Sequence, residues 1–202
     1  MAGTMPHAIF VETGLDGGRS VAAYAAELPG CATFASTDAD AVSAMPRRAA
    51  AFTGWLRSAG EDAPEFIGDN WYEVERAAGT AEHRAAFSLD ELPPSASEFA
   101  AYLRYLELAR EAVADAIDLA GERMDTARLR SVAAQDLVFA GELGTAADPT
   151  DADAVDRLFS ARDTLTAALE AAGPAAPGVR RILRVTIADD LRLAGLLDGG
   201  PR

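Results

Sequence analysis

The stretch VAAYAAELPGCATFASTDADAVSAMPRRAAAFTGWLRSAG, residues 21–60, decides the fold of the first third of the chain. A β-rich run ends at Leu28-Pro29-Gly30-Cys31, and a short strand, Ala32–Ala35, is predicted to follow it. Thr37-Asp38 is typical of a helix start. Apolar residues then recur at steps of three and four, the spacing of one helix face: Val42, Met45, Ala49, Phe52 and Leu56. The stretch therefore predicts a strand, a turn, a strand and a helix.

The segments before this stretch begin a small sheet. His7–Thr13 is predicted to form the first strand and Ser20–Ala26 the second. Leu15-Asp16-Gly17-Gly18 is predicted to be the turn between them, because two glycines supply the positive φ angles of a tight hairpin. The helix after the third strand is predicted over about Asp38 to Ala59, with Pro46 either kinking it or delaying its start by a turn.

Two further strands and a boundary are predicted next. Trp71–Arg76 alternates in the manner of a strand, and Ala85–Phe87 is predicted to form another, joined to it around Gly79. Leu92-Pro93-Pro94-Ser95 then indicates a domain boundary, because paired prolines block helix propagation. We therefore expect an α+β fold whose first domain, residues 1–94, holds a small antiparallel sheet with one packed helix.

The hydrophobic period changes to 3.6 after Ser95 and stays there. Four helices are predicted near residues 96–120, 125–143, 151–172 and 177–197, with glycines at the breaks between them. Short links between amphipathic helices favour an antiparallel bundle. We therefore expect the second domain, residues 95–202, to be an antiparallel four-helix bundle.

The order of elements in the first domain is similar to that of a known family. A strand, the LPGC turn of residues 28–31, a second strand and a helix that ends in Trp55-Leu56 together resemble the HicB-like domain, over about residues 7–90. That resemblance implies a mostly non-catalytic fold. It also implies a possible protein partner, since a HicB-like antitoxin neutralises a basic toxin.

Two segments of the predicted bundle carry a second resemblance. Residues 129–136, LRSVAAQD, and residues 183–193, LRVTIADDLRL, resemble segments of the DinB-like four-helix bundles, over about residues 95–198. Members of that family with a metal use three histidines, which fall here on Ser131, Asp189 and Leu193. The two histidines of this chain, His7 and His83, lie outside the bundle. The resemblance therefore implies the bundle without the metal site, and we expect no metal and no cofactor.

One charged residue interrupts the apolar face of each predicted bundle helix near its middle. The four positions are Arg110, Asp136, Arg162 and either Asp189 or Asp190. Mid-helix positions of an antiparallel bundle share a layer, and buried charges need partners, so these groups are predicted to meet. Two interpretations stay open. The layer is either a structural ion-pair cluster or a polar pocket that binds a small anion or another polar ligand.

The composition limits the class of partner. The chain of 202 residues has 32 acidic side chains against 18 arginines and no lysine, a net charge of −14. Residues 1–94 hold 14 acids and 6 arginines, and residues 95–202 hold 18 and 12. Both halves would repel a phosphate backbone, so we expect no nucleic-acid partner.

Cysteine use and hydropathy indicate the compartment. Cys31 is the single cysteine, which rules out an internal disulfide and fits a reducing cytoplasm. No apolar run reaches the ~20 residues that cross a bilayer, and the N-terminal residues do not resemble a signal peptide. We expect a cytoplasmic protein with no membrane partner.

Two functional hypotheses follow. The first is a non-enzymatic regulatory or interaction protein, a HicB-like/DinB-like fusion that forms a homodimer. The alternative is a DinB-like transferase or hydrolase with an altered, non-histidine site that binds a small polar ligand. In both, the candidate binding residues are the charged ones of the predicted bundle: Arg110, Asp136, Arg162, Asp189 and Asp190.

Overall fold

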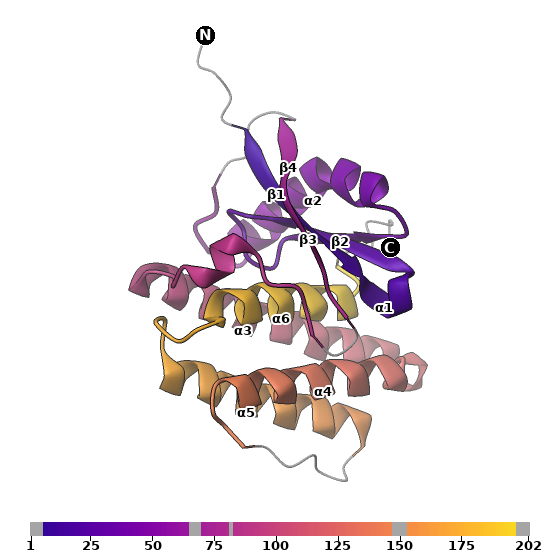
Figure 1. Cartoon of the computed structure of the whole chain (residues 1–202). Coiled ribbons are helices and arrows are strands. Elements are labelled where there is room, and N and C mark those ends of the chain that lie inside the picture. The colour runs from indigo at the N-terminus through magenta and orange to yellow at the C-terminus, as the bar shows by residue number, and fades with distance from the viewer. Residues whose placement is uncertain (1–5, 65–69, 81–82, 147–152, 197–202) are drawn as a thin grey trace.

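The computed structural model describes residues 6–64, 70–80, 83–146 and 153–196. Within them the fold is mixed α+β, with one four-stranded sheet and six helices (Figure 1). The strands are β1 (His7–Gly14), β2 (Ser20–Ala25), β3 (Ala32–Ala35) and β4 (Trp71–Ala78). The helices are α1 (Leu15–Gly18), α2 (Asp38–Ser58), α3 (Ala96–Ala120), α4 (Thr126–Glu142), α5 (Ala154–Ala172) and α6 (Val179–Leu193). Two 3₁₀ turns, η1 (Ser88–Glu91) and η2 (Gly121–Arg123), flank α3.

The sheet has the strand order β3-β2-β1-β4. The β1–β2 and β2–β3 pairs are antiparallel, as expected, but β4 pairs with β1 in parallel. The expectation of an antiparallel sheet is therefore wrong at this edge. The cause is the crossover: α2 carries the chain back along the sheet, so that β4 starts from the same end as β1 and runs in the same direction.

The strand expected at Ala85–Phe87 does not form. Main-chain N–H groups of this segment donate hydrogen bonds to carboxylate side chains and not to a neighbouring strand. The Ala85 N–H donates to Glu12 Oε1 at 2.7 Å, and the Phe87 N–H donates to Asp90 Oδ2 at 3.0 Å. The segment therefore crosses the sheet without pairing to a strand.

The helix α2 begins where the sequence predicts it. Thr37 is its N-cap, and the Thr37 side chain accepts a hydrogen bond from the Asp40 N–H at 3.2 Å. The helix starts at Asp38, ahead of Pro46, so the proline does not delay it. The predicted stripe is buried at Met45, Ala49, Phe52 and Leu56, and α2 packs on β2 and β3.

The LPGC turn lies against α6. Gly30 has a φ of +86°, and a Cβ atom there would lie 2.1 Å from Ile187 Cγ2. The turn approaches α6 so closely that only glycine fits. One hydrophobic core accordingly includes Ile9 of β1, Phe52 of α2, Leu106 of α3 and Ile187 itself. The division into two domains at residues 92–95 stays a prediction; that segment connects η1 to α3.

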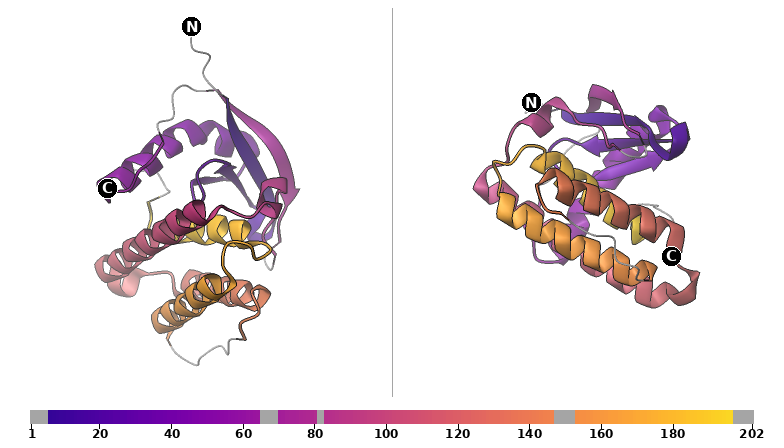
Figure 2. Two further views of the ribbon diagram at one scale, coloured as in Figure 1. Left: turned by 90° about the vertical axis from the view of Figure 1, so that its left-hand side faces the viewer. Right: turned by 60° about the horizontal axis from the view of Figure 1, so that its bottom comes forward.

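The helices after residue 95 lie close to their predicted ranges. Ser95 and Glu98 form a capping box at the start of α3, and Asp125 and Asp153 cap α4 and α5. Residues 151, 152 and 197, at predicted helix ends, lie outside the described residues. The helix α3 packs on α6, and α4 packs on α5 (Figure 2). No helix among the described residues is both long and apolar enough to cross a membrane.

Candidate ligand-binding site

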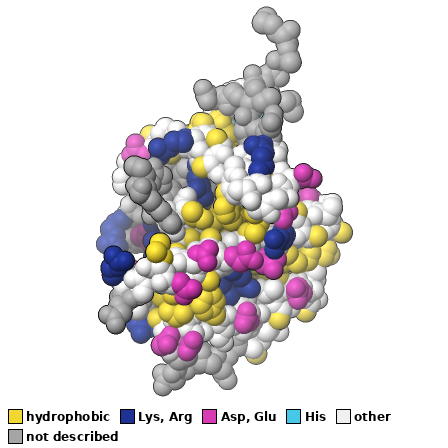
Figure 3. Space-filling model, turned by 180° about the vertical axis from the view of Figure 1, so that it is seen from behind, with side chains coloured by type: hydrophobic (Ala, Val, Ile, Leu, Met, Phe, Trp, Pro, Cys, Tyr) yellow, Lys and Arg dark blue, Asp and Glu magenta, His cyan; other side chains and the backbone are white. Residues whose placement is uncertain are grey.

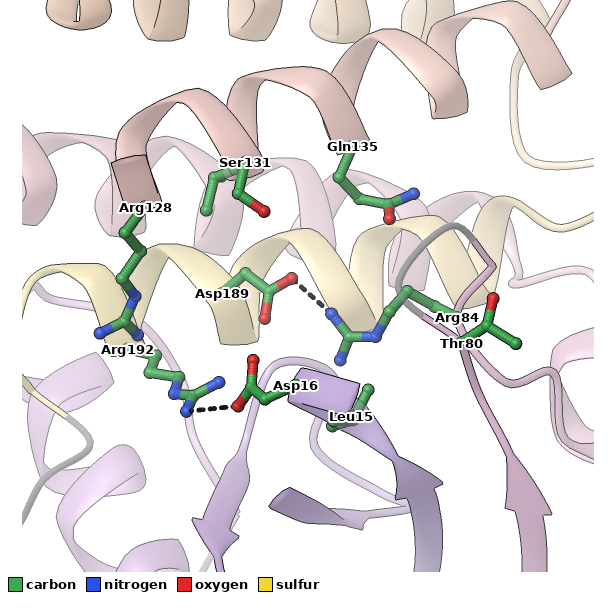
Figure 4. Close-up of a pocket in the computed structure, with 10 residues that line it drawn as sticks. Leu15, Asp16, Thr80, Arg84, Arg128, Ser131, Gln135, Asp189 and Arg192 are labelled. Atoms are coloured by element: carbon green, nitrogen blue, oxygen red, sulfur yellow. Dashed lines mark hydrogen bonds and ion pairs between the residues drawn. The ribbon is translucent and has the colours of Figure 1, made fainter. Parts of the chain in front are cut away.

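A polar cavity of about 170 Å³ lies where four distant parts of the chain meet (Figure 4). The turn α1, the segment after β4, the helix α4 and the helix α6 each form one wall. We call it the Asp189 cavity, after the carboxylate at its centre. Its lining residues are Leu15, Asp16, Thr80, Arg84, Arg128, Ser131, Val132, Gln135, Asp189 and Arg192.

The turn α1 places one carboxylate in the cavity wall. Asp16 has a φ of 52° and Gly17 a φ of 71°, so the hairpin turns through the left-handed region. Aspartate tolerates this region better than most residues because its short polar side chain bonds locally. A hydrogen bond with Ser20 and the nearby Arg192 charge lower the pKa of Asp16. Asp16 Oδ2 lies 3.4 Å from Arg192 Nη2.

Arg84 anchors the wall that follows β4. Its side chain is 8% exposed, and all three guanidinium nitrogens donate hydrogen bonds. Nε donates to Glu12 Oε1 at 3.1 Å, Nη1 to Asp189 Oδ2 at 2.5 Å and Nη2 to Tyr24 Oη at 2.5 Å. Although burial opposes its charge, the facing groups, Asp189, Tyr24 and Glu12, hold the pKa of Arg84 well above its ordinary value. Arg84 is therefore a permanent cation that positions Asp189.

A buried carboxylate supports Arg84 from behind. Glu12 is wholly buried in β1, and besides Arg84 it accepts hydrogen bonds from Tyr24 Oη at 2.8 Å and from the Ala85 N–H. Burial raises the pKa of Tyr24, which keeps its hydroxyl as a donor to Glu12. A Cβ atom at Gly79 would lie 2.3 Å from Glu12 Oε1, so the chain after β4 approaches this carboxylate through a glycine.

The helices α4 and α6 supply the remaining polar walls. Ser131 and Gln135 face the cavity from α4, and Gln135 Nε2 is buried with no hydrogen-bond partner among the described residues. Asp189 and Arg192 face it from α6, one helical turn apart. The guanidinium of Arg192 also lies 4.3 Å over the ring of Phe34. Figure 4 shows Arg84 on one side of Asp189, and Arg128 and Arg192 on the other.

The charged layer predicted from the helix faces forms beside this cavity. Arg162 pairs with Asp190 through Nη2, and its Nε donates to Asp190 Oδ2 at 3.2 Å. Asp136 Oδ2 lies 3.9 Å from Arg162 Nε, and Arg110 Nη2 donates to the Arg162 carbonyl. These four residues therefore meet. Asp189, the alternative to Asp190, instead faces the cavity and pairs with Arg84.

Three members of the charged layer are closed to solvent, whereas the fourth, Arg110, is half-buried and lines a separate pocket beside Leu106 and Thr166. Asp136 and Arg162 are 1% exposed and Asp190 is fully buried, and none of the three lines the Asp189 cavity. Burial, only partly offset by Arg162, raises the pKa of Asp136 to about 7. Burial likewise lowers the pKa of Arg162 to about 10 and lowers that of Arg110. This geometry favours a structural layer. Ligand binding by Arg110, Asp136, Arg162 and Asp190 stays a prediction.

The positions that the DinB-like resemblance assigns to metal ligands are partly brought together. Ser131 and Asp189 both line the cavity, whereas Leu193 is buried in a hydrophobic cluster. Within the described part of the chain, no three histidine, cysteine, aspartate or glutamate side chains are grouped to hold a metal ion.

The sequence patterns predict few of the residues of the cavity. They place Asp16 in a turn and give no binding role to Arg84, Arg128, Gln135 or Arg192. One signal was available: Glu12 is a charged residue in a strand that is otherwise apolar at its centre, IFVE, and a buried carboxylate requires a cationic partner. The partner itself, Arg84, lies in an irregular segment without a period.

Comparison of the chain with protein-family models, with curated proteins and with solved structures finds no match. Function is therefore inferred from the chemistry of the cavity.

Proposed function

We propose that this protein is a non-enzymatic regulatory protein that binds a small polar ligand in the Asp189 cavity. One observation carries the proposal: charged side chains from four separate chain segments converge on a cavity of about 170 Å³. A cavity of about 150 Å³ accommodates benzene, so this one suits a ligand of a few heavy atoms. Convergent polar groups around a preformed cavity are typical of ligand sites.

The cavity is held in a binding geometry before any ligand arrives. Glu12 and Tyr24 fix Arg84, and Arg84 fixes Asp189. Rigid side chains lose little conformational entropy on binding, which favours affinity for a small ligand. The cavity is lined by α1 and the segment after β4 on one side and by α4 and α6 on the other. A bound ligand would therefore bridge the sheet side and the helical side of the molecule. Such a bridge suits a sensor.

The two family resemblances fit this proposal. In this interpretation residues 1–94 form a HicB-like domain, residues 95–202 form a DinB-like bundle, and the cavity lies beside the position of the family's metal site. Ser131 and Asp189 stand where that site would have histidines, and neither favours zinc or nickel as imidazole does. The chain would use two of these positions, together with α1 and the segment after β4, to line a binding cavity.

A cavity-filling substitution tests ligand binding. Ser131 is an exposed α4 residue on the cavity wall, so Ser131→Phe should fill the cavity and leave the fold intact. Ser160→Phe makes the same change at an exposed position of α5 outside the lining. We expect small carboxylates, amines or amino acids to raise the melting temperature of the parent and of Ser160→Phe, but not that of Ser131→Phe. Equal responses in all three proteins would contradict the proposal.

The alternative, a transferase or hydrolase with an altered site, makes a different prediction. Ser131 is the one hydroxyl of α4 on the cavity wall, and Asp189 lines the same space. An enzyme would convert its ligand, so mass spectrometry of a bound ligand after prolonged incubation distinguishes the two. An unchanged ligand supports a regulatory protein, and a product formed by the parent but not by Ser131→Phe supports the enzyme.

We further propose that the regulatory role involves a protein partner and a homodimer. Tyr72 and Val74 on the edge strand β4 are 45% and 44% exposed. Figure 3 shows hydrophobic side chains gathered between charged ones on one face of the molecule. Apolar surface of this kind favours association. Light scattering at micromolar concentration should give twice the chain mass of 21.1 kDa, and a monomer would contradict the dimer.

A further inference from the structure

We propose that the ligand of the Asp189 cavity is a zwitterion, a small amino acid with one ammonium and one carboxylate group. This inference rests on the proposed function. It commits the ligand to a chemical class, which follows from the charge balance of the cavity and from the hydrogen bonds already made inside it.

The charges around the cavity balance. Arg84, Arg128 and Arg192 line it together with Asp16 and Asp189. Glu12, directly behind Arg84, supplies a third carboxylate. A ligand without net charge preserves this balance. A dianion would add negative charge to a chain of net charge −14, and a dication would add positive charge beside three arginines.

The hydrogen bonds assign the two ends of the ligand. The nitrogens of Arg84 all donate to protein groups, so Arg84 is a positioning residue. Asp189 accepts from Arg84 through Oδ2, and its Oδ1 accepts no hydrogen bond from the described residues. In Figure 4 the carboxylate of Asp189 points into the cavity. Asp189 Oδ1 is therefore the acceptor for the ammonium group of the ligand.

The opposite side of the cavity suits a carboxylate. Arg128 and Arg192 lie together there, across from Arg84, and Arg192 also pairs with Asp16 at 3.4 Å (Figure 4). Guanidinium groups bind carboxylates with strong, charge-assisted hydrogen bonds. Gln135, whose Nε2 is a donor without a partner among the described residues, lies on the α4 wall nearer to Arg84 and away from this end (Figure 4). The arrangement orients an amino acid with its ammonium on Asp189 and its carboxylate on the two arginines.

A matched ligand series tests the class. Isothermal titration calorimetry at pH 7 and low salt compares alanine and 4-aminobutyrate with butyrate, n-butylamine and succinate. We expect at least one of the two zwitterions to bind tenfold or more tightly than each of the other three. Tighter binding of butyrate, butylamine or succinate, lost in Ser131→Phe, overturns the zwitterion and leaves the proposed function standing. No binding by any member of the series, and no thermal shift by any of the twenty amino acids, overturns both.

Two substitutions test the assigned ends. Asp189→Asn keeps an acceptor for Arg84 and should lower the affinity for the zwitterion and for butylamine about tenfold, with no loss of affinity for butyrate. Arg128→Gln should lower the affinity for the zwitterion and for butyrate about tenfold, with no loss of affinity for butylamine. Arg130→Gln, at an exposed position of the same helix, is the matched control. Should Asp189→Asn fail to fold, Arg128→Gln alone tests the orientation, through its opposite effects on the binding of butyrate and of butylamine. Equal weakening of all ligands by both variants overturns the orientation and the class.

Discussion

Arg84 Nη1 donates a hydrogen bond to Asp189 Oδ2 at 2.5 Å, and this ion pair ties the segment after β4 to the helix α6. The same guanidinium donates to Glu12 in β1. Three elements that are distant in sequence therefore meet at one arginine that is 8% exposed. A buried cation with two carboxylate partners makes the cavity wall rigid, and it also makes the fold sensitive to the loss of either partner.

Glu12→Gln should destabilise the protein strongly. The substitution removes a wholly buried carboxylate that accepts from Arg84, Tyr24 and the Ala85 N–H, and it places amide hydrogens where acceptors are needed. Breaking a buried ion pair on one side costs about 3–5 kcal/mol. We expect a loss of this order in the free energy of unfolding, measured by urea denaturation.

The control for Glu12 is a surface carboxylate. Glu27 pairs with His7, and its side chain is 47% exposed, so Glu27→Gln should cost no more than about 1 kcal/mol. Equal losses in the two variants would show that the buried network around Arg84 contributes nothing special to stability.

In the charged layer, Asp190 should matter more than Asp136. Arg162 makes its direct contacts with Asp190, whereas Asp136 lies 3.9 Å away. Asp190→Asn leaves a buried guanidinium without its ion pair and should cost about 3–5 kcal/mol at pH 8. Asp136→Asn should cost little there or stabilise, because burial already opposes the charge of this carboxyl. Urea denaturation of both variants gives the order, and the reverse order would contradict it.

Helix periodicity explains how much of the charged layer was predictable. Arg110, Asp136 and Arg162 each interrupt an apolar stripe, and the 3.6-residue period alone places them inside. The period could not separate Asp189 from Asp190, since neighbours on a helix differ by only about 100°. The structure uses both: Asp190 joins the layer and Asp189 the cavity.

The cavity and the direction of β4 depend on contacts that no local pattern records. Arg84 lies in an irregular segment, and Asp16 enters the cavity through a left-handed turn. In the sequence, Arg128 and Arg192 look like ordinary charged residues on the polar faces of helices. The alternation at Trp71–Arg76 identified the strand correctly, but alternation carries no information about parallel or antiparallel pairing.

Gly30→Ala should destabilise the contact between the LPGC turn and α6. The new Cβ atom would overlap Ile187, and the alanine would have to adopt a positive φ. Overpacking costs about 1–3 kcal/mol beyond the strain of the left-handed backbone. Gly17→Ala isolates that strain, because Gly17 has a φ of +71° and no neighbour within 4 Å of an added Cβ. Thermal unfolding should show the larger loss for Gly30→Ala, and equal losses would contradict the close approach to α6.

Asp136 should give the protein a stability that falls as the pH rises towards neutrality. Burial raises the pKa of Asp136 from 3.8 to about 7, so the folded chain keeps a proton that the unfolded chain has released. This contribution is fully present below pH 3.8 and is lost as the pH rises through about 7.

Asp136→Asn cannot ionise and should escape this loss. The groups that act on Asp136 are Arg162 from α5, Arg110 from α3 and Asp189 from α6. All three remain in the variant, as does Asp190, the partner of Arg162. We therefore expect the free energy of unfolding of Asp136→Asn, relative to the parent, to rise from pH 5 to about pH 7 and then to level off in urea denaturation. Asp163→Asn removes an exposed carboxylate of the neighbouring helix α5, and its free energy of unfolding should change with pH as that of the parent does. A constant difference between Asp136→Asn and the parent would show that Asp136 is ionised in the folded protein throughout this range.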